Sequence, residues 1–545
     1  MPESFASTSN HAAEVIVVGA GHNGLIAAAY LARSGFDTLL LEARSSVGGC
    51  SSTEEDLGAR FNICNCDHTM VRAMPMIDEL GLADHGLEYL ENEVGYVSAF
   101  HDDSEPWLFF HEIDRTLEEI AAVYPDQLEG YRRYLDDALP VSRLILDIAR
   151  TRPSTTRILA TTAARKAQGA ARLLEWSRRS AQEVMSRYFS AWQLTMPAFS
   201  TGPTVWGVAP ETPGTGLAAA GYATRHLVKS GRPRGGSGAL GDSLLRCFEA
   251  AGGRVRCEAR VARILIDDGA AIGVELDDGQ RLTSSTIVAA CDPQRVFVDW
   301  VDDPPPAARR LVERWRGLPV RDGYESKIDA VLDHVPTPKL AERVAARHPG
   351  VDLLGPTTVL SPSPAQLAEG HRLRAEDRVA PFPTFLSNLP SVLDPSMAPS
   401  DGHVLSLEVL FTPYALEGGW PDSHEPRRWL ELWAQSMEPG ALDSVRDWRA
   451  MTPDVYEAQF SMHRGHTPAF AGSPLATLLG RRSELTRYRT PLAGLYLCGA
   501  GTYPGAGVFG ASGRNAAAVV EHDRHHPIGR RLMPARTRLA EAGRR

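Results

Sequence analysis

The feature that most limits what this chain can fold into lies near its start. A short apolar run rich in β-branched residues, EVIVVG (14–19), comes just before an alanine-rich segment, GLIAAAYLARSG (24–35). The first run is typical of a buried parallel strand, and the second predicts a helix from about Asn23 to Ser34, ending at Gly35. A second apolar run, DTLLLEA (37–43), predicts another strand, so the chain opens with a strand–helix–strand unit.

Gly19, Gly21 and Gly24 stand between the first strand and the helix with the spacing GxGxxG. The first glycine permits a tight turn, the second lets the backbone approach a pyrophosphate, and the third lets helix and strand pack closely. The helix N-terminus then offers free N–H groups and partial positive charge to the phosphates. Glu42, at the end of the second strand, can accept hydrogen bonds from ribose hydroxyls and would repel a 2′-phosphate. The unit therefore predicts dinucleotide binding and disfavours NADP.

Two further glycine-rich segments bear on which dinucleotide is bound. A doublet, Gly48-Gly49, follows Glu42 closely and offers a second close backbone approach, which suits a long, extended cofactor. Near the other end of the chain, GLYLCGAG (494–501) is typical of a buried strand that runs into a glycine turn. A helix is predicted to begin there near Ala511. The chain thus carries a glycine-to-helix turn at each end.

Three blocks, residues 19–49, 231–246 and 494–520, resemble the FAD-binding family of amine oxidases and carotenoid desaturases. Within that family they look like the phytoene desaturase-like branch. The pair His22-Asn23 is similar to a sub-branch that includes desaturase-type β-carotene ketolases.

The resemblance implies that FAD is the cofactor and that the two glycine turns serve its two ends. The first turn would hold the pyrophosphate, and the late helix would aim its N-terminus at the pyrimidine end of the flavin ring. The strand around Val261 would meet the adenine through its backbone. The predicted FAD-binding residues are Gly19, Gly21, Gly24, Glu42, Ala43, Arg44, Gly48, Gly49, Val261, Gly499, Ala500, Gly510 and Ala511.

The predicted fold class is α/β, with a discontinuous Rossmann-like FAD-binding domain and an inserted α+β substrate domain. The chain from about 100 to 229 is helical in composition, whereas prolines recur between 301 and 480 and no motif stands out there. The predicted boundaries are 1–95, 232–300 and 481–523 for the FAD-binding domain, 96–231 and 301–480 for the substrate domain, and 524–545 for a basic, disordered tail.

Catalysis in such proteins is hydride transfer between a substrate carbon and flavin N5, and a proton must leave the neighbouring atom. His463, His466 and Tyr503 are the candidates for that proton, with His68 as a further one, because histidine titrates near working pH. Tyr503 stands where many relatives carry histidine, which weakens any imidazole role at that position. A surface role is expected for Arg464.

The predicted function is that of an FAD-dependent oxidoreductase that desaturates or oxidises an apolar polyene or a secondary metabolite. A saturase or a β-carotene ketolase would use the same cofactor frame. A nicotinamide-only dehydrogenase and a flavin-bearing binding or scaffold protein without turnover are the alternatives from other classes. Oxygen, a quinone or NAD each remain open as the electron acceptor.

Composition limits the partners and the compartment. The formal net charge of −10 argues against nucleic-acid binding by the whole chain. Seven scattered cysteines, an odd number, and a polar N-terminus without a signal sequence favour reduced thiols in the cytoplasm. Cys64 and Cys66 form a CxC pair without a second cluster at zinc spacing, so no metal site is predicted.

One basic stretch, residues 149–189, has only Glu175 and Glu183 to oppose its arginines and lysine. It is either a solvated helical face, a peripheral contact with an anionic membrane that delivers an apolar substrate, or a surface for an acidic partner. No apolar run in the sequence is long enough to span a bilayer.

Overall fold

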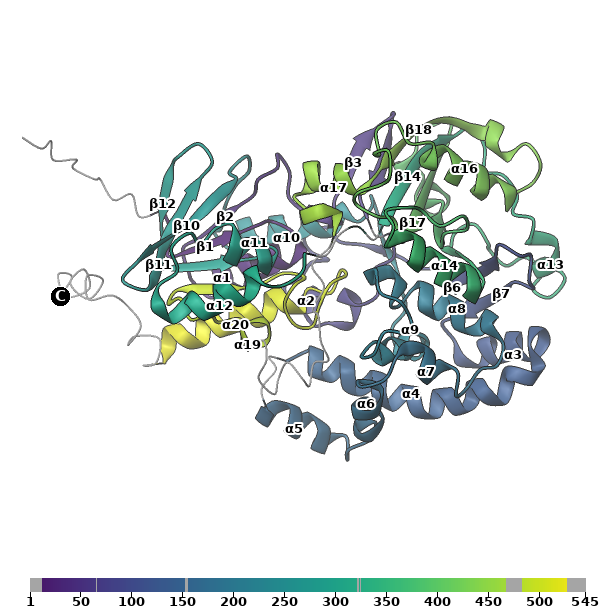
Figure 1. The fold of residues 1–545 in the computed structure, drawn as a ribbon, viewed down its shortest axis with the longest axis horizontal. Helices are drawn as coiled ribbons and strands as arrows, with labels where there is room; N and C mark the ends of the chain where they lie inside the picture. The colour runs from purple at the N-terminus through teal and green to yellow at the C-terminus, as the bar shows by residue number, and fades with distance from the viewer. Residues whose placement is uncertain are drawn as a thin grey trace, which may run out of the picture.

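The computed structural model describes residues 12–64, 66–151, 155–320, 323, 325–466 and 483–526 of the 545-residue chain. Figure 1 shows two units beside each other, each built on its own large sheet. We call the one that contains both glycine turns the first unit and the other the second unit. Most of the predicted basic tail, residues 527–545, lies outside the described residues.

The first unit is built on a five-stranded sheet in which every neighbouring pair is parallel. Its strands, in spatial order, are β19 (Leu495–Leu497), β13 (Thr286–Ala289), β1 (Val15–Val18), β2 (Thr38–Leu41) and β9 (Arg254–Arg256). Parallel strands covered on both faces carry continuous apolar runs, as β1 and β2 do. The late strand β19 is therefore part of the same sheet as the opening unit, although almost the whole chain separates them.

Helices cover one face of this sheet, and a small sheet with two helices covers the other. The first face carries α1 (His22–Arg33), α10 (Gly238–Ala250) and α20 (Ala511–His525), and α1 packs between the other two. The opposite face carries β10 (Val261–Asp267), β11 (Ala270–Leu276), β12 (Arg281–Thr283), α11 (Pro293–Val298) and α12 (Pro306–Arg316). Because α12 belongs to this core, the first unit extends beyond the boundary predicted at residue 300.

The second unit is built on a seven-stranded mixed sheet, in which only β15 and β6 are parallel neighbours. Its order is β18 (Val445–Met451), β14 (Glu325–Leu332), β17 (His403–Leu410), β16 (Phe385–Asn388), β15 (Thr358–Ser361), β6 (Val94–Phe100) and β7 (Trp107–Phe110). One face packs on helices that lie between residues 113 and 227, chiefly α3 (Ile113–Val123), α4 (Leu128–Ala149), α7 (Ala181–Met185), α8 (Trp192–Ser200) and α9 (Gly221–Leu227) (Figure 1). The other face packs on α16 (Glu425–Gln435).

Five of those seven strands lie in the part of the chain where the sequence showed no motif. The strand β14 explains why, since its sequence ESKIDAVL has charged residues at alternate positions (Glu325, Lys327 and Asp329), yet all eight residues are buried. Such alternation is typical of a strand with one face in solvent, and here the polar face is covered by the first unit instead. The described part of the chain contains no helix with the length and hydrophobicity that crossing a bilayer requires.

Candidate active site

A cavity of about 510 Å³ runs through the first unit and reaches the sheet of the second. Its walls include both glycine turns, the Gly48-Gly49 doublet, the end of β2, the start of β10 and the end of β13. Of the thirteen predicted FAD-binding residues, eleven line it: Gly19, Gly21, Gly24, Glu42, Ala43, Arg44, Gly48, Gly49, Val261, Gly499 and Ala500. The structure thus brings together residues from both ends of the chain around one space.

The three glycines of the first turn meet different surroundings. Gly19 has φ +96°, which favours glycine, and a Cβ there would lie 3.1 Å from the sulfur of Cys291. A Cβ on Gly24 would lie 1.9 Å from the carbonyl oxygen of Gly19. With any side chain at this position, helix α1 could not start so close to strand β1. Gly21 has an ordinary extended backbone, φ −64° and ψ 165°, and a Cβ there would meet nothing within 4 Å. The space at Gly21 is the cavity itself, where the pyrophosphate of a dinucleotide fits.

The Gly48-Gly49 doublet packs directly on the first turn. Gly48 donates its backbone N–H to the carbonyl of Ala20 at 2.8 Å, and both glycines have positive φ, +107° and +57°. A Cβ on Gly49 would lie 3.1 Å from the Cα of Gly21. The doublet is therefore required for the close approach of two backbone segments at the cavity wall.

Glu42 and Arg44 shape the wall beyond the end of β2. One carboxylate oxygen of Glu42 accepts the backbone N–H of Ala20 at 2.8 Å, and the other accepts that of Arg44 at 3.0 Å. These bonds hold the carboxylate at the cavity, where it can also accept hydrogen bonds from a ribose. The guanidinium of Arg44 pairs with Glu54 and lies 4.2 Å over the ring of Phe460.

In the late turn, Gly499 and Ala500 line the cavity, whereas Gly510 and Ala511 do not. Gly510 is the N-cap of α20 with φ +75°, and a Cβ on it would lie 2.5 Å from Met76 and 2.6 Å from Ile26. This glycine is needed for packing and backbone conformation. The expectation that Gly510 and Ala511 contact the cofactor is therefore not supported by their position.

His22 and Asn23 connect the two glycine turns, a role that the sequence did not reveal. The side-chain oxygen of Asn23 accepts the backbone N–H of Gly513, at the start of α20, at 3.3 Å. A Cβ on Gly513 would lie 2.2 Å from the Asn23 carbonyl, so α1 and α20 are in close contact. His22 lines the cavity; burial lowers its pKa to about 4, although a hydrogen bond with the Gly507 backbone opposes that shift. The imidazole is thus neutral at neutral pH.

Of the proton-transfer candidates, only His463 lines the cavity. Its Nδ1 lies 3.5 Å from a carboxylate oxygen of Glu457. His466 is buried outside the cavity lining, and so is Tyr503, which packs against Leu144 and Ile148. Burial raises the pKa of the Tyr503 phenol.

Two other predicted residues have structural surroundings. His68 is fully buried away from the cavity lining, and its Nδ1 lies 3.0 Å from the Tyr89 hydroxyl. Burial lowers the pKa of His68 to about 3, so it does not carry a proton at neutral pH. The guanidinium of Arg464 lies 4.7 Å over the ring of Tyr414.

Sequence reasoning missed the wall that the second unit contributes. Glu325 and Glu408, on strands β14 and β17, line the cavity together with Cys50, Cys64 and Met462. The doublet placed Cys50 near the site, and the CxC pair singled out Cys64 without giving it a role, but no spacing or motif pointed to Glu325, Glu408 or Met462. The two glutamates reach the cavity only because the sheet of the second unit packs against the first.

The residues present fit an elongated dinucleotide. Open space at Gly21, the N-terminus of α1 and the carboxylate of Glu42 follow one another along the cavity, as a pyrophosphate and an adenosine ribose require. In the remaining part of the cavity the walls include the apolar side chains of Trp206 and Met462. FAD bound there would supply a two-electron hydride acceptor.

Comparison with known proteins gives relatives that span nearly the whole chain. The pyridine nucleotide-disulfide oxidoreductase domain-containing protein 2 of Rattus norvegicus is 29% identical over 94% of this chain and 93% of its own. One of the subunits of limonene dehydrogenase from Castellaniella defragrans is 27% identical over 94% of each chain. The lycopene-forming phytoene desaturase of Pantoea ananas is 26% identical over 92% of this chain and 97% of its own.

Solved structures confirm the predicted fold class. Wild-type putrescine oxidase bound to putrescine superimposes with a TM-score of 0.60 at 18% identity, covering 94% of this chain and 99% of the other. An oxidoreductase from Methanosarcina mazei gives 0.56 at 14% identity, covering 93% and 99%. At these identities the likeness concerns the fold alone.

The family model described as flavin containing amine oxidoreductase matches residues 24–320, more than half of the chain. This match and the phytoene desaturase relatives confirm the predicted FAD cofactor and oxidoreductase class, whereas nothing in them marks out the β-carotene ketolase sub-branch. The chain belongs to the family of flavin-containing amine oxidoreductases, which bind FAD.

Proposed function

We propose that this protein is an FAD-dependent dehydrogenase that removes two hydrogens from an apolar organic substrate. The observation that carries the proposal is the single cavity joining the two glycine turns to the sheet of the second unit. A cofactor held by the first unit would meet there a substrate held by the second. In this arrangement a substrate carbon would give its hydride to flavin N5 while the surrounding side chains exclude water.

The roles of the thirteen residues predicted to bind FAD remain a proposal, and their positions relative to the cavity divide them into two groups. The eleven that line the cavity are proposed to contact FAD, and Gly510 and Ala511 are proposed to support the late turn from behind. We likewise propose a division near residue 318 in place of 300, because α12 packs on the first unit. The other boundaries stay as predicted, except that β6 begins at Val94 and therefore starts just before the boundary at 95.

The substrate class rests on the cavity and on the names of two relatives. Limonene and phytoene, named in those relatives, are hydrocarbons without charged groups, and the cavity offers Trp206 and Met462 to such a surface. Putrescine, named in the structural neighbour, is a diamine. We favour the hydrocarbon class, with desaturation as the reaction; ketolation and saturation are outcomes that the product distinguishes.

We also propose that residues 149–189 make a peripheral contact with an anionic membrane, which would deliver an apolar substrate. Two of the large apolar side chains that the described structure leaves exposed, Leu159 and Leu174, lie in this stretch. Several of its arginines are already engaged in ion pairs, among them Arg172 and Arg187, which pair with Glu175. The membrane contact therefore depends on the apolar side chains and the remaining cations together.

The purified protein tests the proposal directly. We expect the absorption spectrum of a bound oxidised flavin, and bleaching of that spectrum when limonene or phytoene is added without oxygen. Mass spectrometry should then show a product lighter by two hydrogens, whereas a ketolase would add oxygen. Putrescine is the third probe. Bleaching by putrescine alone would overturn the hydrocarbon class, and a protein that takes up no FAD would overturn the proposal as a whole.

Admitting oxygen, a quinone or NAD in turn to the reduced protein identifies the electron acceptor. The one that restores the oxidised spectrum fastest is the acceptor.

A further inference from the structure

The cavity wall that the second unit supplies carries two carboxyl groups beside each other. Glu325 lies on β14 and Glu408 on β17, and both line the cavity. In the antiparallel register Lys327 is opposite Glu408, and Glu325 is two residues before Lys327. All three side chains therefore lie on one face of the sheet, with Glu325 and Glu408 in diagonal positions.

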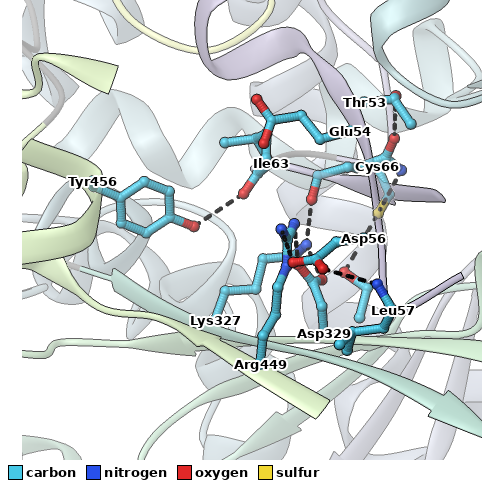
Figure 2. A network of polar contacts seen from close by, with 12 residues as sticks. Thr53, Glu54, Asp56, Leu57, Ile63, Cys66, Lys327, Asp329, Arg449 and Tyr456 are labelled. Atoms are coloured by element: carbon cyan, nitrogen blue, oxygen red, sulfur yellow. Dashed lines mark hydrogen bonds and ion pairs between the residues drawn. The ribbon is translucent and has the colours of Figure 1, made fainter. Parts of the chain in front are cut away.

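The cations on this face are already paired with other anions. Lys327 is fully buried and donates to the carbonyl of Asn62 and to the carboxylate of Asp329 (Figure 2). Arg449 contacts the other oxygen of Asp329 at 3.1 Å and a carboxylate oxygen of Asp56 at 2.9 Å. Two cations and two anions thus balance one another, and none of this positive charge is left for the cavity wall.

In the part of the chain that the structure describes, Lys327 is the one cation among the groups that act on Glu408. Arg232, which acts on the neighbouring thiol of Cys66, donates from Nε to Asp67 at 2.7 Å. The charged or titratable groups that act on Glu408, or on which it acts, from neighbouring elements are Glu325, Lys327, Asp329, Asp67, Cys64, Cys66 and Tyr456. Apart from Lys327, this set carries only negative or neutral groups.

Glu408 itself is 7% exposed, and among the described residues its carboxyl group has no hydrogen bond or ion pair. An ionised carboxylate in that position would have no ion pair and would meet solvent only at the cavity wall, which disfavours the charged form. Burial, and then the negative charge of Glu325, hold the pKa of Glu408 well above its usual range. The burial of Glu408 and its lack of an ion pair among the described residues both favour this raised pKa.

We propose that Glu408 and Glu325 share one proton at neutral pH and form the acid–base group of the cavity, with Glu408 in contact with the substrate. The proposal rests on the proposed dehydrogenation. Two negative charges in one site repel each other, so a pair of carboxyl groups keeps one proton between them. Such a pair can donate that proton or accept a second one.

The step balances in atoms and electrons. One substrate C–H bond would break, and its electron pair would leave with the hydrogen as hydride to FAD held in the cavity, which would accept the two electrons. The bond from the neighbouring substrate atom to its hydrogen also breaks, and its electron pair becomes the new double bond. That hydrogen leaves as a proton and forms an O–H bond with the carboxylate of the pair. The second proton of the pair then passes to solvent.

Infrared difference spectroscopy on the FAD-loaded protein tests the shared proton without any substrate. At pH 7 we expect a protonated-carboxyl band, shifted in D₂O, that disappears in Glu408→Gln. Glu431→Gln is the matched control, since Glu431 is an exposed residue of α16 and its loss should leave the band intact. A wild-type spectrum without the band overturns the proposal. Such a spectrum is expected if a bound cation, and not a proton, neutralises Glu325 and Glu408.

Two further measurements keep the test valid if Glu408→Gln folds poorly. Glu325→Gln removes the like charge, so the band of Glu408 should titrate at lower pH than in the wild type; an unchanged midpoint contradicts the shared proton. Stability gives an independent reading. Because the folded state holds a proton that the unfolded chain releases above about pH 4.3, wild-type unfolding free energy should fall as pH rises from there. Glu408→Gln should lack that fall.

Activity tests the acid–base role separately. With whichever of limonene, phytoene or putrescine bleaches the flavin, Glu408→Gln should slow bleaching on the order of 10²–10⁴-fold. Reduction by dithionite, which needs no proton from the substrate, should keep its rate. Equal bleaching rates in the variant and the wild type overturn the role. If no probe bleaches the flavin, the proposed function fails, while the infrared result still decides whether the proton is shared.

Discussion

At the scale of single residues, the three glycines of the first turn show that one motif can hold three different constraints. Gly19 is fixed by its positive φ, and Gly24 by the carbonyl that its Cβ would strike. Gly21 has a backbone conformation that any residue adopts and open space around its Cβ position. The described structure shows no steric reason for glycine at position 21, and this supports our proposal that a bound cofactor occupies that space.

This reasoning makes a prediction that separates folding from cofactor binding. Gly21→Val should leave the unfolding temperature of the FAD-free protein near that of the wild type, because the new side chain enters open space. Its affinity for FAD should fall on the order of tenfold or more, since the side chain occupies the pyrophosphate position. Fluorescence titration with FAD measures the affinity, and thermal unfolding measures the stability.

Gly24→Ala is the matched comparison. It should destabilise the FAD-free protein by about 1–3 kcal/mol, because its Cβ overlaps the Gly19 carbonyl. A Gly21→Val protein with full flavin content would show that the first turn does not hold the pyrophosphate.

At the scale of elements, α5 (Thr155–Ala164) lies at the edge of the second unit, as Figure 1 shows, and α6 (Ala170–Trp176) follows it along the chain and buries only Trp176. Leu159 on α5 is 63% exposed, and Leu174 on α6 is 38% exposed. Arg157, Lys166 and Arg178 around them are exposed as well. An apolar side chain surrounded by cations is the arrangement that binds weakly to an anionic bilayer surface.

We therefore expect the protein to sediment with vesicles that contain phosphatidylserine and to remain in solution with neutral vesicles. Binding should weaken as salt rises, because salt screens the attraction between exposed charges. Leu159→Glu should reduce binding about tenfold, since it removes an apolar contact and adds a repelled charge. Val320→Glu is the control, because Val320 is 44% exposed but lies outside this stretch. Equal losses in both variants would contradict a membrane site on α5.

At the scale of the whole molecule, Arg232 holds the two units together. This buried arginine on β8 (Arg232–Pro233) donates to Asp67 at 2.7 Å and to Asn388 at 2.6 Å, at the end of β16 in the large sheet. Burial alone would raise the pKa of Asp67, but the guanidinium of Arg232 and the hydroxyl of Thr357 outweigh it and hold the pKa below its usual value. The stabilisation is therefore present at neutral pH and lost as pH falls below the ordinary range of aspartate.

Arg232→Met should cost about 3 kcal/mol at pH 7, because the Asp67 carboxylate, whose side chain is 27% exposed, loses its charged partner. The difference from the wild type should shrink in acid, where Asp67 takes up a proton. Arg234→Met is the matched control: Arg234 pairs with Glu88 at 2.7 Å, but both side chains are more than half exposed, so the change should cost less than about 1 kcal/mol. Urea unfolding at pH 7 and pH 4 measures both variants. Similar costs for the two would contradict the role given to Arg232.

Most of the first unit could be predicted because its signals are local. The run from Val15 to Leu41, the doublet Gly48-Gly49 and the late turn at Gly499 each depend on backbone conformation and on nearest neighbours, which short segments of sequence encode. The second unit could not be predicted in this way. Its strand β14 carries charged residues at alternate positions, and nothing local shows that this charged face would be buried.

The sequence by itself determined the strand–turn–helix units and the residues that shape the two glycine turns, because steric limits at glycine and apolar periodicity act within a few residues. The prediction of FAD followed from the resemblance of these segments to a known family. Only the tertiary structure decided that Gly510 and Tyr503 lie outside the cavity and that Glu325 and Glu408 lie on its wall. It also decided that His22 and Asn23 join the two turns. The physical reason is that burial and charge pairing are properties of the packed interior, to which residues hundreds of positions apart contribute together.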